Sequence, residues 1–247
     1  LHLWFAQSAI TAWTNRPPLS NQPVYGTLVN GQRVIYGIGG YYRGSPFIRI
    51  GYDSPAGVLC AYHVDIPKSA PFLGSSELNL DSLEPGRDNT YLRERMSFWI
   101  AEEMGLAVSA QRYVRLYING SQRGSIFADV LQPSADYLEC WYPDDSSGEL
   151  FKIDDWTEFS NDWYQINYMV DNRSGTLEDF RTTGGGKKKA RYRYSWEKKS
   201  VHGFDDSFDR IFALVDAMNE TNATDYLNRV RAQIDVDEWC RVFALRH

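Results

Sequence analysis

A series of short strand-like segments in the first third of the chain limits the fold more than any other feature. Segments 24–29, 33–38, 47–52 and 58–66 are rich in β-branched and aromatic residues, and each is bounded by glycine, proline or asparagine. Asn30-Gly31 lies between the first two, and this pair favours the two-residue turn of a hairpin because type I′ turns need positive φ. The sequence therefore predicts a meander of antiparallel strands.

A helical period replaces the strand pattern after residue 88. Leu92, Met96, Trp99, Ile100 and Met104 recur at helical spacing and Gly105 follows them, which predicts a helix over 89–105. Strands are predicted next at 112–118 and 125–130, joined by 119–124, and a brief strand at 150–153. Helical patterns return at 208–218, 226–233 and 236–243. The order of elements indicates an α+β protein.

Composition excludes several classes of protein. The 247 residues carry a net charge of −6, so no overall positive field would draw the chain to nucleic acid, which is not expected as a partner. The three cysteines are too widely spaced for a structural zinc site, and no apolar run is long enough to span a membrane. The chain has neither an initiator Met nor a signal-peptide pattern, so we expect it to be part of a longer protein.

The segment 37–45 is the densest in glycine. A dinucleotide or Walker loop needs a helix after its glycines, whereas strands are predicted on both sides of this segment. A glycine turn between antiparallel strands is the geometry with which protein kinases cover nucleotide phosphates. An ordinary hairpin with a bulge is the structural alternative, and both interpretations stay open at this point.

Two lysines and one glutamate are candidates for a phosphate site. Lys152 lies in an apolar strand-like stretch, and Lys68 follows the segment 58–66. In protein kinases, a phosphate-binding lysine pairs with a glutamate of the first helix. Of the glutamates in the predicted helix, Glu94 lies nearest the apolar face. A solvated edge-strand lysine and a loop lysine are the structural alternatives.

A basic segment supports a different class of function. Residues 171–189 are polar and are expected to be a mobile excursion. In 187–199 aromatic residues alternate with basic ones, and this alternation predicts a strand with one cationic face. Such a face would suit an acidic partner in a surface or coat assembly. A polysaccharide-binding module is the third alternative, if Trp141, Trp156 and Trp163 share an exposed groove.

Several segments, taken together in their order and spacing, resemble the spore-coat CotH kinase family. The resemblance covers roughly residues 35–247, and its segments are Tyr42-Arg43-Gly44-Ser45, 91–106, 114–120, 148–152 and 235–247. They look like the family's RGxS turn, its arginine-containing helix ending in Met-Gly, its strand ending in Asn-Gly, its short lysine element and its closing helix.

This resemblance implies a protein-kinase-like bilobal fold, with an antiparallel β-sheet N-lobe and one helix followed by the first helices of a C-lobe. We accordingly expect an N-lobe over 1–132, with its helix at 89–105. Residues 133–247 would hold a connector, the basic excursion and the start of a truncated C-lobe. The family's catalytic and metal-binding aspartates would lie beyond His247, so we expect a fragment without the catalytic loop and without turnover.

The resemblance also implies an ATP-dependent phosphotransferase that uses Mg²⁺ and acts on serine or threonine of secreted or coat proteins, outside the cell or at its surface. An acidic protein substrate would suit the basic segment. The residues expected to contact the cofactor are Arg43, Gly44, Ser45, Lys68, Glu94, Asp129 and Lys152. Asp129 would lie near the base or ribose, where family members usually carry a glutamate. Non-catalytic assembly and polysaccharide binding are the alternatives.

Overall fold

The computed structural model describes residues 1–44, 49, 52, 60–82, 90–153, 176–193, 196–200 and 206–246. They belong to two compact units, which are described separately. The first consists chiefly of Leu1–Phe98 and Ser109–Gln132. The second consists chiefly of Trp99–Val108, Pro133–Trp156 and the described residues after 175.

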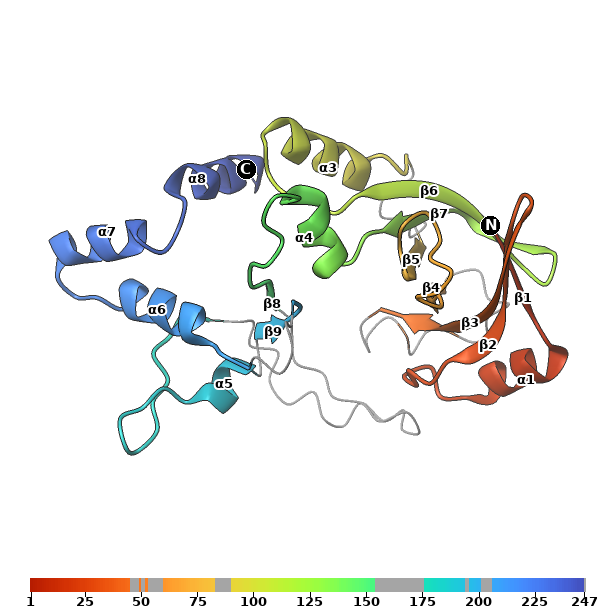
Figure 1. Cartoon of the computed structure of the whole chain (residues 1–247), viewed down its shortest axis with the longest axis horizontal. Helices are drawn as coiled ribbons and strands as arrows, with labels where there is room; N and C mark the ends of the chain where they lie inside the picture. Colours follow the sequence, from red (N-terminus) through yellow and green to blue (C-terminus); the bar gives the residue numbers. More distant parts are fainter. Residues whose placement is uncertain are drawn as a thin grey trace. The chain divides into compact units, whose positions relative to one another are not determined.

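The first unit contains a closed seven-stranded barrel with the order β1-β2-β3-β4-β5-β7-β6 (Figure 1). Its strands are β1 (His2–Phe5), β2 (Val24–Asn30), β3 (Arg33–Arg43), β4 (Ala61–Asp65), β5 (Glu77–Ser82), β6 (Gln111–Ile118) and β7 (Ser121–Val130). The short strand β1 closes the barrel, because it pairs antiparallel with β2 and parallel with β6. The side chain of Asn119 extends this seam by accepting from the backbone N–H of Phe5 at 2.8 Å and donating to its carbonyl at 3.0 Å.

The predicted protein-kinase-like bilobal fold is wrong. The strands form one closed barrel, not the antiparallel sheet of an N-lobe that leads into a helical lobe. The sequence patterns did not predict β1 or β5. At four residues β1 is too short to show a clear period, and its pairing with β6 joins parts of the chain that no local pattern relates.

Side chains point alternately into and out of the barrel along each strand, and the inward ones are apolar and fill its interior. The most buried are Leu3, Leu28, Ile38, Tyr62, Val64, Leu78, Leu80, Leu116, Ile118 and Phe127. Helix α1 (Gln7–Asn15) adds Trp13, whose ring lies 5.5 Å from that of Phe5 and 5.3 Å from that of Tyr42. Trp13 is 2% exposed, so this indole belongs to the barrel core.

Most of the glycine-rich segment, residues 37–43, lies inside β3 and is not a turn between two strands. Gly26 of β2 pairs with Ile38 while the next residue of β2 pairs with Tyr36, so Gly37 is an extra residue in β3, and its φ is +72°. This is a β-bulge, as the structural alternative proposed. At Gly40 an added Cβ would lie 3.0 Å from Cζ of Phe5 and 3.2 Å from the Trp13 ring, so close packing requires glycine there.

The two predicted hairpins, β2–β3 and β6–β7, are confirmed, but the first loop is shifted along the chain and the second is shorter than predicted. β2 and β3 are joined by Gly31-Gln32, and Gly31 has the positive φ that the turn requires. β6 and β7 are joined by Asn119-Gly120, where both residues have positive φ as a type I′ turn demands. The predicted connection 119–124 was too long, because β7 already begins at Ser121.

The second unit combines short helices with one pair of strands. Its elements are the end of α3 (Arg93–Glu103), then α4 (Ala135–Trp141), β8 (Phe151–Ile153), α5 (Lys189–Arg193), β9 (Trp196–Lys198), α6 (Asp209–Met218), α7 (Ala223–Arg231) and α8 (Val236–Arg246). β8 and β9 pair antiparallel. The core consists of Tyr192, Trp196, Phe208, Ile211 and Val215.

These elements confirm the predicted helices at 89–105, 208–218, 226–233 and 236–243 to within a few residues. The predicted strand over 187–199 is wrong in its first half, because 189–193 form α5, whose Tyr192 is buried on one side of a helical turn. Among the described residues, no helix has both the length and the apolar character needed to cross a bilayer.

Candidate functional site

The outward face of β3, β4 and β5 carries a row of polar side chains. Their neighbours in sequence point into the barrel and are buried, as the alternation of a strand requires. Tyr41 pairs with His63, and His63 pairs with Asn79, so these three lie across adjacent strands. The outward polar set is Tyr41, Arg43, His63, Asp65, Glu77, Asn79 and Asp81.

Arg43 and Asp81 form an ion pair at the end of this row, and Glu94 of α3 lies near them. Burial of the Glu94 carboxyl raises its pKa, and the negative charge of Asp81 acts in the same direction. The nearby Gln111 side chain and the charge of Arg43 only partly offset this rise. The Arg43 guanidinium therefore pairs with Asp81, and its charge also acts on Glu94.

A second guanidinium, that of Arg49, lies beside the end of β3. Arg49 is 6% exposed, and its Nε donates to the carbonyl of Gly44 at 2.7 Å while Nη1 donates to Oδ1 of Asn21 at 2.6 Å. Burial lowers its pKa to about 10, and the like charge of Arg43 adds to this effect. The end of β3 therefore holds two arginines whose charges repel each other.

The rest of the polar row is fixed by side-chain contacts. The Tyr41 ring stacks on His63 with a centroid distance of 4.8 Å, and burial together with the charges of Asp65 and Glu77 raises the pKa of Tyr41 to about 12. Nδ1 of His63 lies 2.7 Å from Oδ1 of the buried Asn79. These contacts hold the sheet surface next to Arg43 in one arrangement.

The structure brings three of the predicted site residues together, namely Arg43, Gly44 and Glu94. Gly44 has a φ of 112° directly after β3, where its carbonyl accepts from Arg49. The cation that acts on Glu94 is Arg43, where the sequence predicted a lysine. Ser45 lies outside the described residues.

The other predicted residues lie elsewhere. Lys68 is exposed in a turn closed by the hydrogen bond from the N–H of Ala70 to the carbonyl of Pro67. Asp129 is buried in β7, and its carboxylate pairs with Arg112. Lys152 belongs to the second unit, where it is half-buried in β8.

Sequence reasoning missed Arg49, Asp81 and Gln111. The alternation Glu77-Leu78-Asn79-Leu80-Asp81 is a strand signal that predicts β5 and places Asp81 on its polar face. Arg49 had been assigned to a strand as one member of an apolar stretch. Its role depends on a contact with Gly44 that no periodicity reveals.

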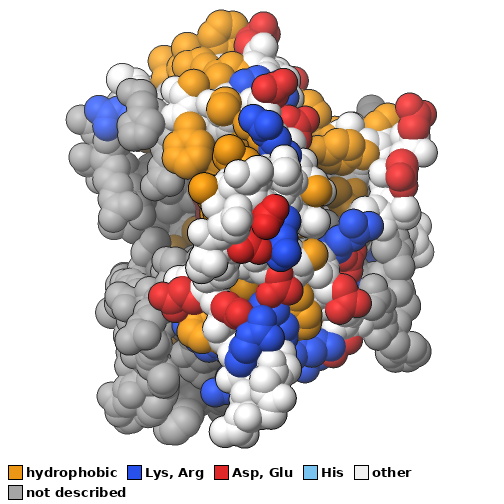
Figure 2. Space-filling model, turned by 90° about the vertical axis from the view of Figure 1, so that its left-hand side faces the viewer, with side chains coloured by type: hydrophobic (Ala, Val, Ile, Leu, Met, Phe, Trp, Pro, Cys, Tyr) orange, Lys and Arg blue, Asp and Glu red, His pale blue; other side chains and the backbone are white. Residues whose placement is uncertain are grey.

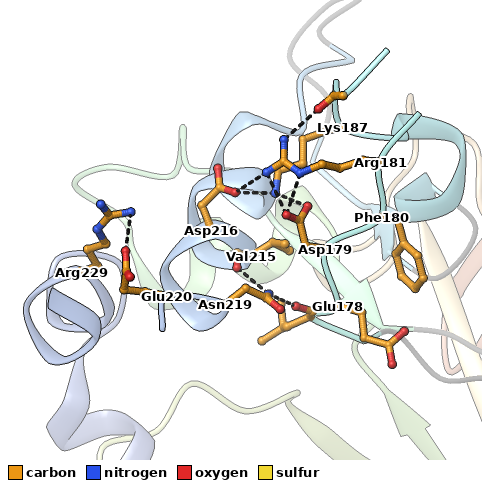
Figure 3. Close-up of polar contacts among 12 residues, drawn as sticks. Glu178, Asp179, Phe180, Arg181, Lys187, Val215, Asp216, Asn219, Glu220 and Arg229 are labelled. Atoms are coloured by element: carbon orange, nitrogen blue, oxygen red, sulfur yellow. Dashed lines mark hydrogen bonds and ion pairs between the residues drawn. The ribbon is translucent and has the colours of Figure 1, made fainter. Parts of the chain in front are cut away.

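The basic segment of the second unit is largely neutralised by carboxylates. Lys187 Nζ lies 2.7 Å from Oδ1 of Asp179 and 2.5 Å from Oδ1 of Asp216, and Arg181 contacts the same two aspartates (Figure 3). Further pairs are Lys189 and Arg193 with Asp206, Lys198 with Glu149, and Lys199 with Glu197. These contacts hold the described part of the predicted mobile excursion against α6.

In the described part of the basic segment, the charges therefore do not form the continuous cationic face that assembly with an acidic partner requires. On the face drawn in Figure 2, lysine and arginine side chains are interspersed with aspartate and glutamate. For the polysaccharide alternative, Trp141 donates its indole N–H to the carbonyl of Val108 at 2.6 Å, while Trp156 and Trp163 lie outside the described residues.

Comparison with known proteins identifies the family. The family model described as CotH kinase protein matches residues 60–247, which is well over half of the chain. A comparison with curated proteins gave no match. The match includes β4 to β7 and all of the second unit, and so contains Asp81, Glu94, Asp129 and Lys152. The chain therefore belongs to the CotH kinase family.

Proposed function

We propose that this chain supplies the nucleotide-phosphate contacts of an ATP-dependent phosphotransferase that acts on serine or threonine of secreted or surface proteins. The proposal rests on the family to which the chain belongs and on one observation, the pair of arginines beside Gly44. ATP would place its phosphates at Arg43 and Arg49.

The chemistry of the arginine pair suits a phosphate group. A guanidinium presents donors in a planar fork that matches two phosphate oxygens, and it keeps its charge at any physiological pH. Arg49 is buried, so its attraction for an anion is screened less than that of an exposed side chain. A bound phosphate would also relieve the repulsion between the two cations.

Asp81 and Glu94 would position Arg43 rather than contact the nucleotide. The ion pair with Asp81 fixes the guanidinium at the end of β3, and Glu94 lies near it from the first turn of α3. Lys68, Lys152 and Ser45 remain candidates for further phosphate contacts. Asp129 is a less suitable contact for the base or ribose, because Arg112 and the backbone N–H of Asn79 already use its two oxygens.

The described residues do not fit a metal site made by the protein alone. Within them, no group of three or more histidine, cysteine, aspartate or glutamate side chains could hold a metal ion. Mg²⁺ is commonly held by one or two carboxylates and the substrate phosphates, so it would enter with ATP. No step of the proposed function is assigned to it.

The test is thermal unfolding of the chain with and without ATP and Mg²⁺. At a ligand concentration a hundredfold above Kd, binding to the folded state should add about 2.7 kcal/mol of stability. Arg43→Gln and Arg49→Lys should lose most of this gain, since each removes one planar fork. Arg231→Gln, on the exposed surface of α7, is the matched control and should keep it.

Two results would contradict the proposal. One is a wild-type chain whose unfolding temperature does not change with ATP at any concentration tested. The other is an equal ATP-dependent rise in wild type and in both arginine variants, because the arginines would then contribute nothing to the site.

A further inference from the structure

The outward surface of β1, β2 and β3 presents a group of exposed aromatic side chains. Trp4, Tyr25 and Tyr36 are 46%, 70% and 75% exposed, although each lies in a barrel strand. We call these three residues, together with Thr27 between them, the aromatic face. Large rings exposed to this extent on adjacent strands mark an interaction site more often than isolated surface residues do.

The register of the strands sets the arrangement of the rings. Trp4 pairs with Thr27, which in turn pairs with Tyr36, so these residues form a row across β1, β2 and β3. Because adjacent strands lie about 4.8 Å apart, the two outer residues of the row are roughly 10 Å apart. Tyr25 lies two residues along β2 on the same side. The rings therefore stand on a rigid surface with regular spacing.

The charge around the aromatic face is unusual for a chain with a net charge of −6. Residues 1–44, which contain the whole face, include no aspartate or glutamate. Toward β6, His2 stacks on Tyr117 with a centroid distance of 4.5 Å, and Arg115 is exposed two residues earlier. On the other side, the carboxylate of Asp65 lies beside Gly39, which pairs with Tyr25, and this carboxylate contacts His63.

We propose that the aromatic face binds a polysaccharide whose sugars carry carboxylate groups. The flat apolar sides of pyranose rings would stack on Trp4, Tyr25 and Tyr36, as apolar surfaces do on aromatic rings. Arg115 would attract the sugar carboxylates, and residues 1–44 contribute no acidic side chain that would repel them.

A single-stranded nucleic acid is a weaker fit to the same rings. Proteins that bind such strands combine stacking rings with a positively charged groove along the backbone. Here the exposed cationic side chain beside the face is that of Arg115, and a single arginine does not make such a groove. The face contains none of Arg43, Arg49 and Glu94, so the proposal is independent of the proposed nucleotide site.

Affinity electrophoresis in gels containing polygalacturonate tests this proposal with the whole chain. The wild type should be retarded, and the double variant Tyr25→Ala/Tyr36→Ala should bind about tenfold more weakly. Tyr142→Ala removes a tyrosine of the second unit that is 47% exposed, and it should bind as the wild type does. Arg115→Gln should weaken binding and reduce its dependence on salt.

Several outcomes would overturn the proposal. They are an unretarded wild type, equal retardation of the double variant, equal retardation by neutral hydroxyethyl cellulose, and stronger binding to oligo-dT than to polygalacturonate. Both tyrosines are exposed, so the double variant should keep the wild-type circular dichroism spectrum. Its response to ATP should also be unchanged, which separates failure of this proposal from failure of the nucleotide site.

Discussion

Arg112 donates from Nε to Oδ2 of Asp129 at 2.7 Å, directly across the ladder between β6 and β7. The other oxygen of Asp129 accepts from the backbone N–H of Asn79 in β5 at 3.1 Å. One buried carboxylate therefore joins three strands of the barrel. A loss of its charge should weaken both contacts together.

We predict that Asp129→Asn lowers the free energy of unfolding by about 2 kcal/mol, since hydrogen bonds to charged groups are worth more than neutral ones. The amide keeps the shape of the side chain but leaves Arg112 without its counter-charge. Urea unfolding measures the change, with the exposed Asp144→Asn as control. A loss no larger than that of the control would show that the carboxylate charge does not stabilise the barrel.

Glu94→Gln should stabilise the chain at neutral pH. The folded state raises the pKa of Glu94 because burial and Asp81 disfavour its charged form, so ionisation costs stability once the pH exceeds the ordinary glutamate value of 4.5. The variant avoids this cost, and we expect its Tm at pH 7 to exceed that of the wild type by up to about 2 °C.

The difference between Glu94→Gln and wild type should vanish below pH 4, where both side chains are neutral. Thermal unfolding from pH 3 to 8 checks this, with Glu103→Gln at the other end of α3 as control. A constant difference over the whole range would mean that the titration of Glu94 is not its cause.

Gly40→Ala should destabilise the barrel by about 1–3 kcal/mol, the usual cost of overpacking a core. The added methyl would approach Cζ of Phe5 to 3.0 Å and the Trp13 ring to 3.2 Å, and both rings are themselves buried. Gly148→Ala is the matched control, because an added Cβ there meets nothing within 4 Å. Guanidinium unfolding compares the two, and equal midpoints would exclude close packing as the reason for glycine at 40.

Lys187→Met should destabilise the second unit by about 1–2 kcal/mol, because Asp179 and Asp216 lose one of the two cations that they share. Burial alone would lower the pKa of Lys187, but the hydrogen bonds to Asp179 and Asp216 outweigh it and raise the pKa. The exposed neighbour Lys188→Met serves as control.

The effect of Lys187→Met should also depend on pH. Lys187 holds the pKa of Asp179 below its ordinary value of 3.8, so this stabilisation is present above that pH and is lost as the pH falls through the lowered value. Unfolding at pH 7 and pH 2.5 should show the variant approaching the wild type in acid. An equal deficit at both pH values would point to lost packing of the lysine stem.

Local patterns predicted those elements whose signals lie within one segment. The hairpin of β2 and β3 and the turn at Asn119-Gly120 follow from residues that tolerate positive φ. The helices α6, α7 and α8 follow from apolar spacing. The closure of the barrel could not be predicted in this way, because it depends on which strand pairs with β1.

The residues of the candidate site also divide into those that a local pattern predicted and those that it did not. Glu94 was found because it lies on a helix with a clear period, and Arg43 and Gly44 because they match a motif. Arg49 and Asp81 reach them through tertiary contacts. The alternation over 77–81 places Asp81 on a polar strand face, but no pattern within one segment shows which residue it meets. The glycines of β3 were misleading for a physical reason. The same residue type serves a flexible turn, a bulge and a close contact with a buried ring.

The seam between β1 and β6 bears on how the barrel folds. The backbone of Phe5 and the side chain of Asn119, which hydrogen-bond across it, are separated by 114 positions in the chain. A contact of such long range requires closure of a large loop before it gains any energy, which slows folding. During synthesis the apolar residues Leu3 and Phe5 must therefore wait, exposed, until β6 has left the ribosome, and that interval is when the barrel is most open to aggregation or to a chaperone.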